Sequence, residues 1–257
     1  MQHMKSLFIL ASLAAGTIWF STEFPKKAFA IQNQDGFAVV ELFTSEGCSS
    51  CPPADIAATE LVNEYKNNVF VLGFHVDYWD HLGWKDIFSN AAYSKRQQQY
   101  GSILGLNSIY TPQVVVNGKK EFVGSDRNRL YATVEGELKG MNAARISLKA
   151  TKTDNNMVAV SYTASAGSSS IVNIALIQLR GQTEVKRGEN SGKRLMHINI
   201  VRDFKSVNNS KEQGNIILSI PEGLSSGDCR VIAYAQNKND WHITTAAEAE
   251  IASPGNK

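Results

Sequence analysis

Short apolar runs alternate with amphipathic stretches along the first half of the chain. Residues 37–43 and 69–75 are apolar and rich in β-branched side chains, which predicts two buried strands. Between them, residues 52–66 follow serines and prolines suited to a helix start and consist of helix formers. Further helices are predicted over residues 89–100, with Ser89 as the cap, and over residues 125–139.

Short strands at residues 113–117 and 120–123 flank Asn117-Gly118, a strong hairpin signal. The resulting order over residues 36–140 is typical of a thioredoxin-like α/β domain, with a right-handed crossover between the first two strands. We expect that domain over this range.

The pattern changes after about residue 141 to short alternating segments separated by polar turn clusters. Such a pattern predicts an antiparallel β-sandwich, here over residues 141–252. Its expected strands are residues 145–151, 157–164, 171–179, 197–202, 216–220, 230–236 and 243–251. The predicted fold is therefore an α/β thioredoxin-like domain followed by an antiparallel β-sandwich domain.

Residues 1–30 have the pattern of a signal peptide. Lys5 precedes an apolar stretch over residues 7–20, and Ala28-Phe29-Ala30 fits a cleavage site after Ala30. An apolar stretch of about 14 residues is shorter than the roughly 20 that span a bilayer, which makes an uncleaved anchor the weaker alternative. We expect export to the periplasm or the extracellular space, with no membrane anchor after cleavage.

The charge balance argues against a nucleic-acid partner. The full chain has 26 basic and 24 acidic residues, a formal charge of +2. Cleavage after Ala30 would remove three basic residues and one acidic residue, so 23 of each sign would remain. Adjacent basic residues occur only in small groups, and none resembles a binding patch.

Cys48 and Cys51 are separated by two serines and lie between the first predicted strand and helix. Thiols at this spacing can form a disulfide, and a helix start favours the thiolate of Cys48. Cys48 would be the exposed nucleophile, and Cys51 would resolve the mixed disulfide. A structural disulfide and half of a metal site are the alternatives, although a four-cysteine zinc site lacks its second pair because Cys229 stands alone. We expect Cys229 to be a buried free thiol.

Thr111-Pro112 comes directly before the strand at residues 113–117. Proline cannot donate a hydrogen bond within a central strand, and a cis Thr111–Pro112 bond is predicted. A proline that simply ends a turn is the alternative. Thioredoxin-like folds place a cis-proline opposite the cysteine pair at about this distance along the chain.

Four blocks, at residues 39–55, 75–86, 109–118 and 187–201, resemble the bacterial predicted secreted proteins grouped as domain of unknown function 1223. The resemblance covers nearly the whole mature chain and implies a thioredoxin-like domain with an attached β domain. Wider similarity to thioredoxins and glutaredoxins implies that Cys48 is the nucleophile, that Cys51 resolves, and that Thr111 and Pro112 contact substrate. The chain lacks the tryptophan before the first cysteine and the Gly-Pro between the pair that thioredoxin has.

Two residues are candidates to support the cysteine pair. Glu41, on the first predicted strand, could accept a proton from Cys51, or it could be a structural carboxylate. His75, with Asp77 beyond it, could poise a thiol or help the cysteines bind a soft metal such as copper, or it could be structural.

Two further groups have open interpretations. The aromatic side chains between the second strand and the next helix form a substrate rim or pack in the core; they are Tyr78, Trp79 and Trp84. The polar loop at residues 187–194 reaches the site or is solvated.

Taken together, these features predict an exported thiol–disulfide oxidoreductase that needs no cofactor. Its partner would be a protein or small molecule that contains a disulfide or thiols. The alternatives are a soft-metal (copper) binding or delivery module, and a non-enzymatic adaptor with a structural disulfide whose β domain binds an unidentified partner.

Overall fold

The computed structural model describes residues 36–254. The expected signal peptide lies outside this range, and no helix within it is long and apolar enough to cross a membrane. In chain order the elements are β1 (Ala38–Thr44), α1 (Pro52–Glu64), β2 (Val69–His75), the 3-10 helix η1 (Asp80–Leu82), α2 (Ala91–Ile103), β3 (Gln113–Val116), β4 (Lys120–Val123), α3 (Arg127–Leu138), β5 (Ile146–Lys152), β6 (Met157–Ala164), β7 (Ser170–Glu184), β8 (Arg194–Asn208), β9 (Gln213–Ser219), the 3-10 helix η2 (Ser226–Asp228), β10 (Cys229–Asn237) and β11 (Ile243–Ala252).

The first half forms the elements that the apolar pattern predicts. β1 and β2 are parallel and are joined through α1, and β3 and β4 form the predicted hairpin. The hairpin turn uses Asn117 and Gly118 with φ of 47° and 73°, the left-handed region that these residues tolerate. The N-cap of α2 lies one residue later than expected, because the side chain of Asn90, rather than Ser89, accepts the N–H of Ala92.

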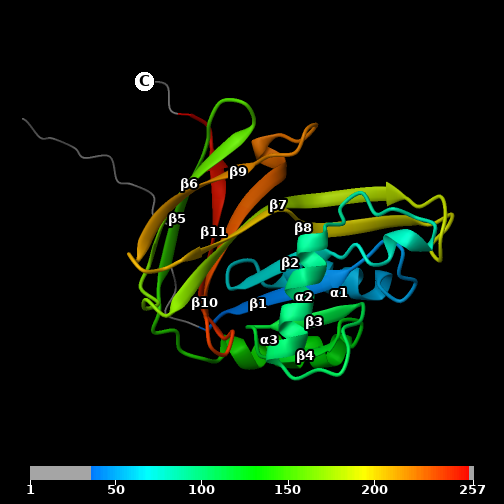
Figure 1. The fold of residues 1–257 in the computed structure, drawn as a ribbon, viewed down its shortest axis with the longest axis horizontal. Helices are drawn as coiled ribbons and strands as arrows, with labels where there is room; N and C mark the ends of the chain where they lie inside the picture. The colour runs from blue at the N-terminus through cyan, green and yellow to red at the C-terminus, as the bar shows by residue number, and fades with distance from the viewer. Residues whose placement is uncertain (1–35, 255–257) are drawn as a thin grey trace, which may run out of the picture.

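The expected pair of separate units is wrong, because the described strands form one mixed sheet. The order of its eleven strands is β4-β3-β1-β2-β8-β7-β10-β11-β5-β6-β9 (Figure 1). β8, from the second half, pairs in parallel with β2 through Gly73 and Ile200. A Cβ at Gly73 would lie 3.4 Å from the carbonyl oxygen of Ile198, which is an ordinary van der Waals distance, so the approach of β8 does not depend on glycine at this position. The fold is therefore not a thioredoxin-like domain followed by a separate antiparallel sandwich.

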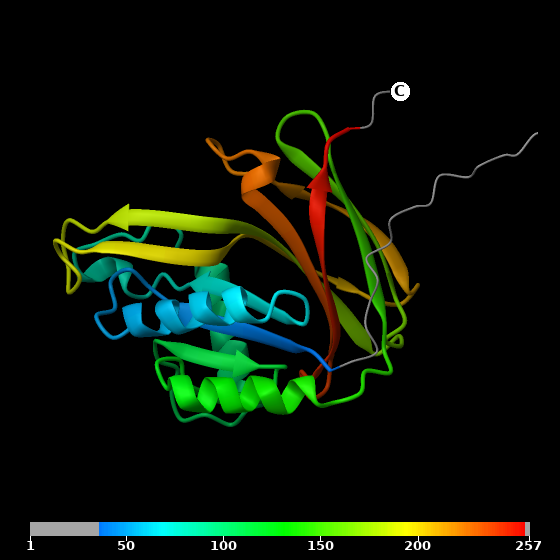
Figure 2. The ribbon, with the colours of Figure 1, turned by 180° about the vertical axis from the view of Figure 1, so that it is seen from behind.

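β7 and β8 explain how the sheet becomes continuous. Each strand has 15 residues, and together they form a long antiparallel hairpin that extends over the first half (Figure 2). Beyond its contact with β2, β8 turns toward the edge strand β9. There Lys205 donates to the carbonyl of Ile217, and Asp203 accepts the N–H of Ser219.

Helices cover the first part of the sheet on both faces. α1 and α3 pack on one face through residues such as Leu61 and Val134, and α2 packs on the other through Tyr93 and Tyr100. The α2 side of this core includes Tyr234 of β10, so both halves contribute to it. The boundary predicted near residue 141 lies between the end of α3 and the start of β5. A division into domains at this place stays a prediction.

Candidate functional site

Cys48 and Cys51 form a disulfide in the turn that joins β1 to α1. Their Cα atoms are 5.4 Å apart, within the usual range for a disulfide. Ser49 and Ser50 are exposed at the tip of the turn, whereas both cysteines are 0% exposed. The expectation that Cys48 is exposed is therefore wrong for the disulfide form, because neighbouring segments cover it.

The start of α1 offers fewer donors to a thiolate than the sequence suggested. Cys51 is the N-cap residue, and its carbonyl accepts the N–H groups of Ala54 and Asp55. Pro52 and Pro53 have no N–H, so the first two helical positions donate nothing. The Sγ atom of Cys48 instead lies 3.4 Å from the hydroxyl of Ser50. A thiolate there would depend on this hydroxyl and on the helix dipole.

The loop between β7 and β8 lies against the cysteine turn. The buried Asn190 donates through Nδ2 to the carbonyls of Glu46 and Cys48, at 2.9 Å each. Glu189 accepts the N–H of Ser49 at 3.0 Å, and Lys193 binds the amide oxygen of Asn190. Of the two interpretations left open for this loop, the structure supports the one in which it shapes the site.

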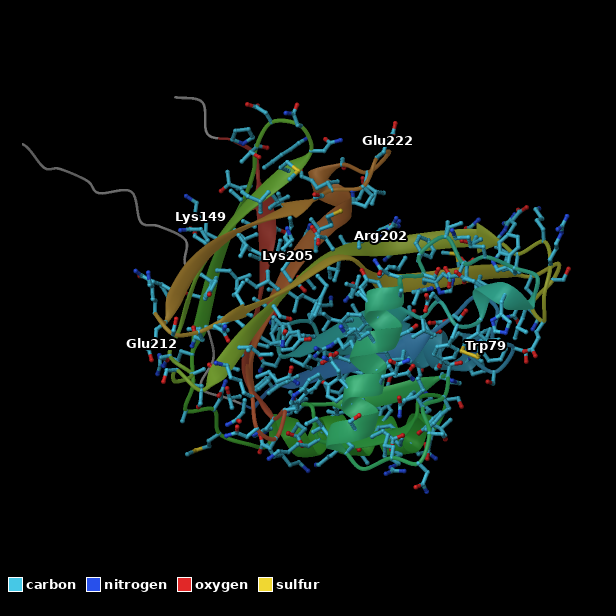
Figure 3. The ribbon with its side chains drawn as sticks, viewed as in Figure 1. Trp79, Lys149, Arg202, Lys205, Glu212 and Glu222 are labelled. Atoms are coloured by element: carbon cyan, nitrogen blue, oxygen red, sulfur yellow. A yellow bond between two sulfur atoms is a disulfide. The ribbon has the colours of Figure 1, made fainter. Side chains whose placement is uncertain are left out.

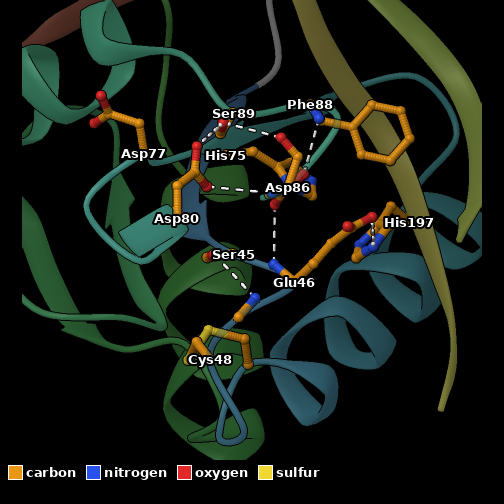
Figure 4. Close-up of polar contacts among 12 residues, drawn as sticks. Ser45, Glu46, Cys48, His75, Asp77, Asp80, Asp86, Phe88, Ser89 and His197 are labelled. Carbon is orange, nitrogen blue, oxygen red and sulfur yellow. Dashed lines mark hydrogen bonds and ion pairs between the residues drawn. A yellow bond between two sulfur atoms is a disulfide. The ribbon is translucent and has the colours of Figure 1, made fainter. Parts of the chain in front are cut away.

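A cluster of ionisable side chains is buried beside the disulfide (Figure 4). His75, at the end of β2, contacts Asp86 with Nδ1 and Oδ2 2.6 Å apart, and the same oxygen accepts the N–H of Glu46. Burial opposes ionisation of Asp86, but His75 and the N–H groups of Glu46 and Phe88 lower the pKa of its carboxyl group. Asp77, expected near His75, instead accepts a hydrogen bond from Ser94.

His197 of β8 lies between two carboxylates from the other half of the chain. Its Nε2 is 3.6 Å from Glu46 Oε1, and its Nδ1 is 3.4 Å from Asp55 Oδ2. Burial alone would lower the pKa of His197, but Asp55 and Glu46 raise it to about 10. The ring is thus a buried cation at neutral pH, and it packs edge to face on His75, with ring centres 4.7 Å apart.

Sequence reasoning did not assign a role to Glu46, Asp55, Asp86 or His197. Weak signals were present, since Glu46 and Asp55 flank the cysteine pair and His197 belongs to one of the four blocks that carry the family resemblance. The contacts of His197 with Glu46 and Asp55 depend on β8 packing beside α1, which no local pattern indicates.

Thr111 and Pro112 approach the cysteine turn through Trp79. The Thr111–Pro112 bond is cis, as predicted. Trp79 donates from its ring nitrogen to the hydroxyl of Thr111 at 2.8 Å, and its Cβ would be 3.1 Å from a Cβ on Gly47. Trp79 lies at the same end of the molecule as the β7–β8 loop (Figure 3).

Trp84 also contacts the cysteine turn. Its ring nitrogen donates to Glu46 Oε2 at 2.7 Å, and it is partly buried. A Cβ on Gly188 would lie 3.3 Å from the Cβ of Trp84, so this residue lies close to the β7–β8 loop. Trp79 and Trp84 therefore lie next to the turn that contains the disulfide.

Glu41 does not approach Cys51, contrary to our expectation. It lies on the α2 face of the sheet, whereas α1 begins on the opposite face. Its carboxylate binds Arg96 of α2 at 2.5 and 2.8 Å and accepts the hydroxyl of Tyr100 at 2.6 Å. These contacts occupy both oxygens and make Glu41 part of a buried ion pair.

The side chains expected as copper ligands contact other groups in the described part of the chain. Within residues 36–254, no group of three histidine, cysteine or acidic side chains is arranged to hold a metal ion. The Nδ1 of His75 is engaged by Asp86, and both cysteine sulfurs are joined to each other.

Residues 39–236 match the model of a family described as a protein of unknown function (DUF1223). The chain belongs to this family. No curated protein matches the chain. The family description names no activity, so the chemistry must be argued from the site.

Two solved structures are similar to this member of the family. A crystal structure of protein AGR_C_4864 from Agrobacterium tumefaciens is 27% identical, with a TM-score of 0.60 over 88% of this chain and 98% of that one. HBP35 of Porphyromonas gingivalis is 19% identical, with a TM-score of 0.59 over 88% of this chain and 79% of that one. At its lower identity, HBP35 shares the fold alone.

Proposed function

We propose that the protein is an exported thiol–disulfide oxidoreductase whose redox couple is Cys48 and Cys51. The observation that carries the proposal is the disulfide between these residues, which spans a two-serine turn at the start of α1. A short turn of this kind brings both thiols within bridging distance, which suits a pair that opens and closes. The proposed substrates are proteins or small molecules that contain a disulfide or a pair of thiols.

The chemistry is disulfide exchange. In the oxidising direction, a substrate thiolate attacks Cys48, the Cys48–Cys51 bond breaks, and Cys51 leaves as a thiolate. The second substrate thiol then attacks the mixed disulfide, which leaves a substrate disulfide and the protein dithiol. Two electrons and two protons pass from substrate to protein, and the reducing direction is the reverse.

Access to the sulfurs requires movement of the segments that cover them. Because Cys48 and Cys51 are fully buried, a substrate needs a local opening at this turn, where Ser49 and Ser50 are exposed and Glu189 accepts the N–H of Ser49. Thr111 and Pro112 would then contact the substrate on the side where Trp79 connects their loop to the cysteine turn.

A structural disulfide in a non-enzymatic adaptor is the second candidate. The zero exposure of both cysteines favours it, since an inert disulfide needs no access. In that case the second half of the chain would bind a partner. A reduction potential below about −300 mV would fit this function.

Turnover of the purified mature protein separates the two candidates. The assay measures insulin reduction and dithiol-peptide oxidation by the wild type and by Cys48→Ser, with Cys229→Ser as a matched control at a buried cysteine outside the couple. We expect Cys48→Ser to abolish turnover and Cys229→Ser to retain it. Equal rates in the wild type and Cys48→Ser would refute the proposed function, and the mature N-terminus, read by mass spectrometry, tests export.

A further inference from the structure

The β7–β8 hairpin contacts the cysteine segment on both sides of the disulfide. His197 meets Glu46, two residues before Cys48, and Asp55, four residues after Cys51. One side chain from the second half of the chain therefore joins the two ends of the segment that the disulfide also closes.

Asn190 adds a second connection from the same hairpin. Its amide binds the carbonyls of Glu46 and Cys48, and Lys193 holds the amide oxygen on the other side. Asn190 is 0% exposed and His197 is 3% exposed, so water competes little for either contact. Together they fix the backbone before the first cysteine and the side chain after the second.

The pairing of β7 with β8 does not require these side-chain contacts. The backbone of His197 already pairs with Gly181 in the β7–β8 ladder, whatever its side chain does. Burying a histidine between two carboxylates costs desolvation, part of which is offset because Trp84 donates to Glu46. A neutral side chain at residue 197 would leave the buried carboxylates of Glu46 and Asp55 without their counter-charge, so His197 acts on both sides of the cysteine pair.

Their effect differs between the two redox states. In the oxidised protein the S–S bond itself holds the turn closed. After reduction only noncovalent contacts remain, and a turn held at both ends keeps the two thiols at a high effective concentration. Loss of these contacts would release the reduced turn more than the oxidised one, so that the disulfide would become easier to reduce.

We propose that His197 and Asn190 are positioning residues that hold Cys48 and Cys51 close enough to re-form their disulfide after reduction. The inference deepens the proposed function and rests on it for its role in turnover. The effect on the disulfide itself is measurable whether or not the protein is an enzyme.

The test is the equilibrium of the purified protein with glutathione at pH 7. Two glutathione thiols reduce the Cys48–Cys51 bond and become oxidised glutathione, and the protein dithiol is counted by alkylation and mass. We expect His197→Gln and Asn190→Ala each to shift this equilibrium about tenfold toward the dithiol, or about 30 mV for a two-electron couple. Met196→Gln, at an exposed position beside His197 on the same strand, is the matched control and should stay within twofold of the wild type.

A merely structural role predicts a different result. It would lower the stability of the oxidised and reduced proteins equally and leave the glutathione equilibrium unchanged. Folded His197→Gln and Asn190→Ala proteins with an equilibrium within twofold of the wild type would overturn the proposal. If His197→Gln does not fold, the decision falls to Asn190→Ala and to Asp55→Asn, which removes one partner of His197 with little change in shape.

The two proposals can fail separately. A shifted glutathione equilibrium in the variants, without turnover in the wild type, would retain the positioning role and refute the enzyme. Turnover in the wild type with an unshifted equilibrium in the variants would do the reverse.

Discussion

Arg96 binds Glu41 through two hydrogen bonds, and neither side chain has appreciable contact with solvent. Arg96 also donates to the hydroxyl of Tyr234, at 2.9 Å, which in turn lies 3.2 Å from Glu41. Burial opposes the charge of Arg96, but Glu41 raises the pKa of its guanidinium well above the usual value. Since Tyr234 belongs to β10, this ion pair connects the two halves of the chain.

Glu41→Gln should strongly destabilise the protein, because it leaves the guanidinium of Arg96 buried without its counter-charge. Removal of one partner of a buried ion pair typically lowers the free energy of unfolding by about 3–5 kcal/mol. Urea unfolding measures the change. Glu60→Gln is the matched control, since it breaks an exposed pair with Arg127 and should cost at most about 1 kcal/mol.

The same variant tests whether Glu41 accepts a proton from Cys51. Because Glu41 lies on the opposite face of the sheet from α1, the folded Glu41→Gln protein should exchange disulfides at the wild-type rate. A large loss of exchange rate, measured under conditions where the variant is still folded, would contradict this placement.

Ser50→Ala should make the reduced Cys48 less reactive at neutral pH. The hydroxyl of Ser50 is the side-chain group found next to Cys48 Sγ, while Pro52 and Pro53 offer no N–H to a thiolate. We expect alkylation of Cys48 by iodoacetamide to slow severalfold, less than a buried hydrogen bond to a charged group would give, because Ser50 is exposed to water. Ser49→Ala keeps the N–H that binds Glu189 and should react like the wild type.

Stability should fall as pH rises from 6.5 to 9 because of His197. Burial lowers the pKa of its imidazole, but Asp55 and Glu46 raise it overall, from 6.5 to about 10. A group whose pKa is higher in the folded protein stabilises it fully below pH 6.5, and this stabilisation is lost as pH approaches 10. The free energy of unfolding should therefore fall by up to about 1.4 kcal/mol per pH unit. The range ends at pH 9 because Cys229, whose pKa burial raises to about 11, begins to contribute above it.

Urea unfolding across this pH range measures the slope. His197→Gln should flatten this slope. His242→Gln should not, because burial lowers the pKa of His242, so that His242 changes the stability only at pH values below 6.5. A slope that persists unchanged in His197→Gln would show that another group titrates.

Local patterns predicted the elements well and their assembly poorly. The strand at residues 69–75 and the helix after Cys51 follow from apolar runs, serines and prolines that act within a few residues of each other. β7 and β8 were predicted as shorter strands because polar residues interrupt their apolar pattern beyond residues 179 and 202. Their full length, and thus the continuous sheet, is set by pairing with each other and with β2.

The same distinction applies to the site. The cysteine pair and the cis bond before Pro112 could be predicted, because residue spacing and position along the chain indicate both features. His197 and Asn190 could not, because their contacts are made only when β8 lies beside α1. Long-range pairing of this kind leaves no periodic signal in a single sequence.

A substitution at Gly118, in the β3–β4 turn, also tests the contact between the two halves of the chain. Gly118 has φ of 73°, and a Cβ there would lie 1.9 Å from the carbonyl oxygen of Trp241, in the turn between β10 and β11. Gly118→Ala should therefore lower the free energy of unfolding by about 1–2 kcal/mol from the backbone alone, and by more because Trp241 must move.

Gly136→Ala is the matched control, since nothing lies within 4 Å of a Cβ at that position in α3. Alanine is the better helix former, so this variant should gain up to about 1 kcal/mol. Thermal and urea unfolding of both variants measure the changes. Equal stability of Gly118→Ala and the wild type would mean that the β3–β4 turn does not pack against the β10–β11 turn, and the contact between the two halves at this place would have to be abandoned.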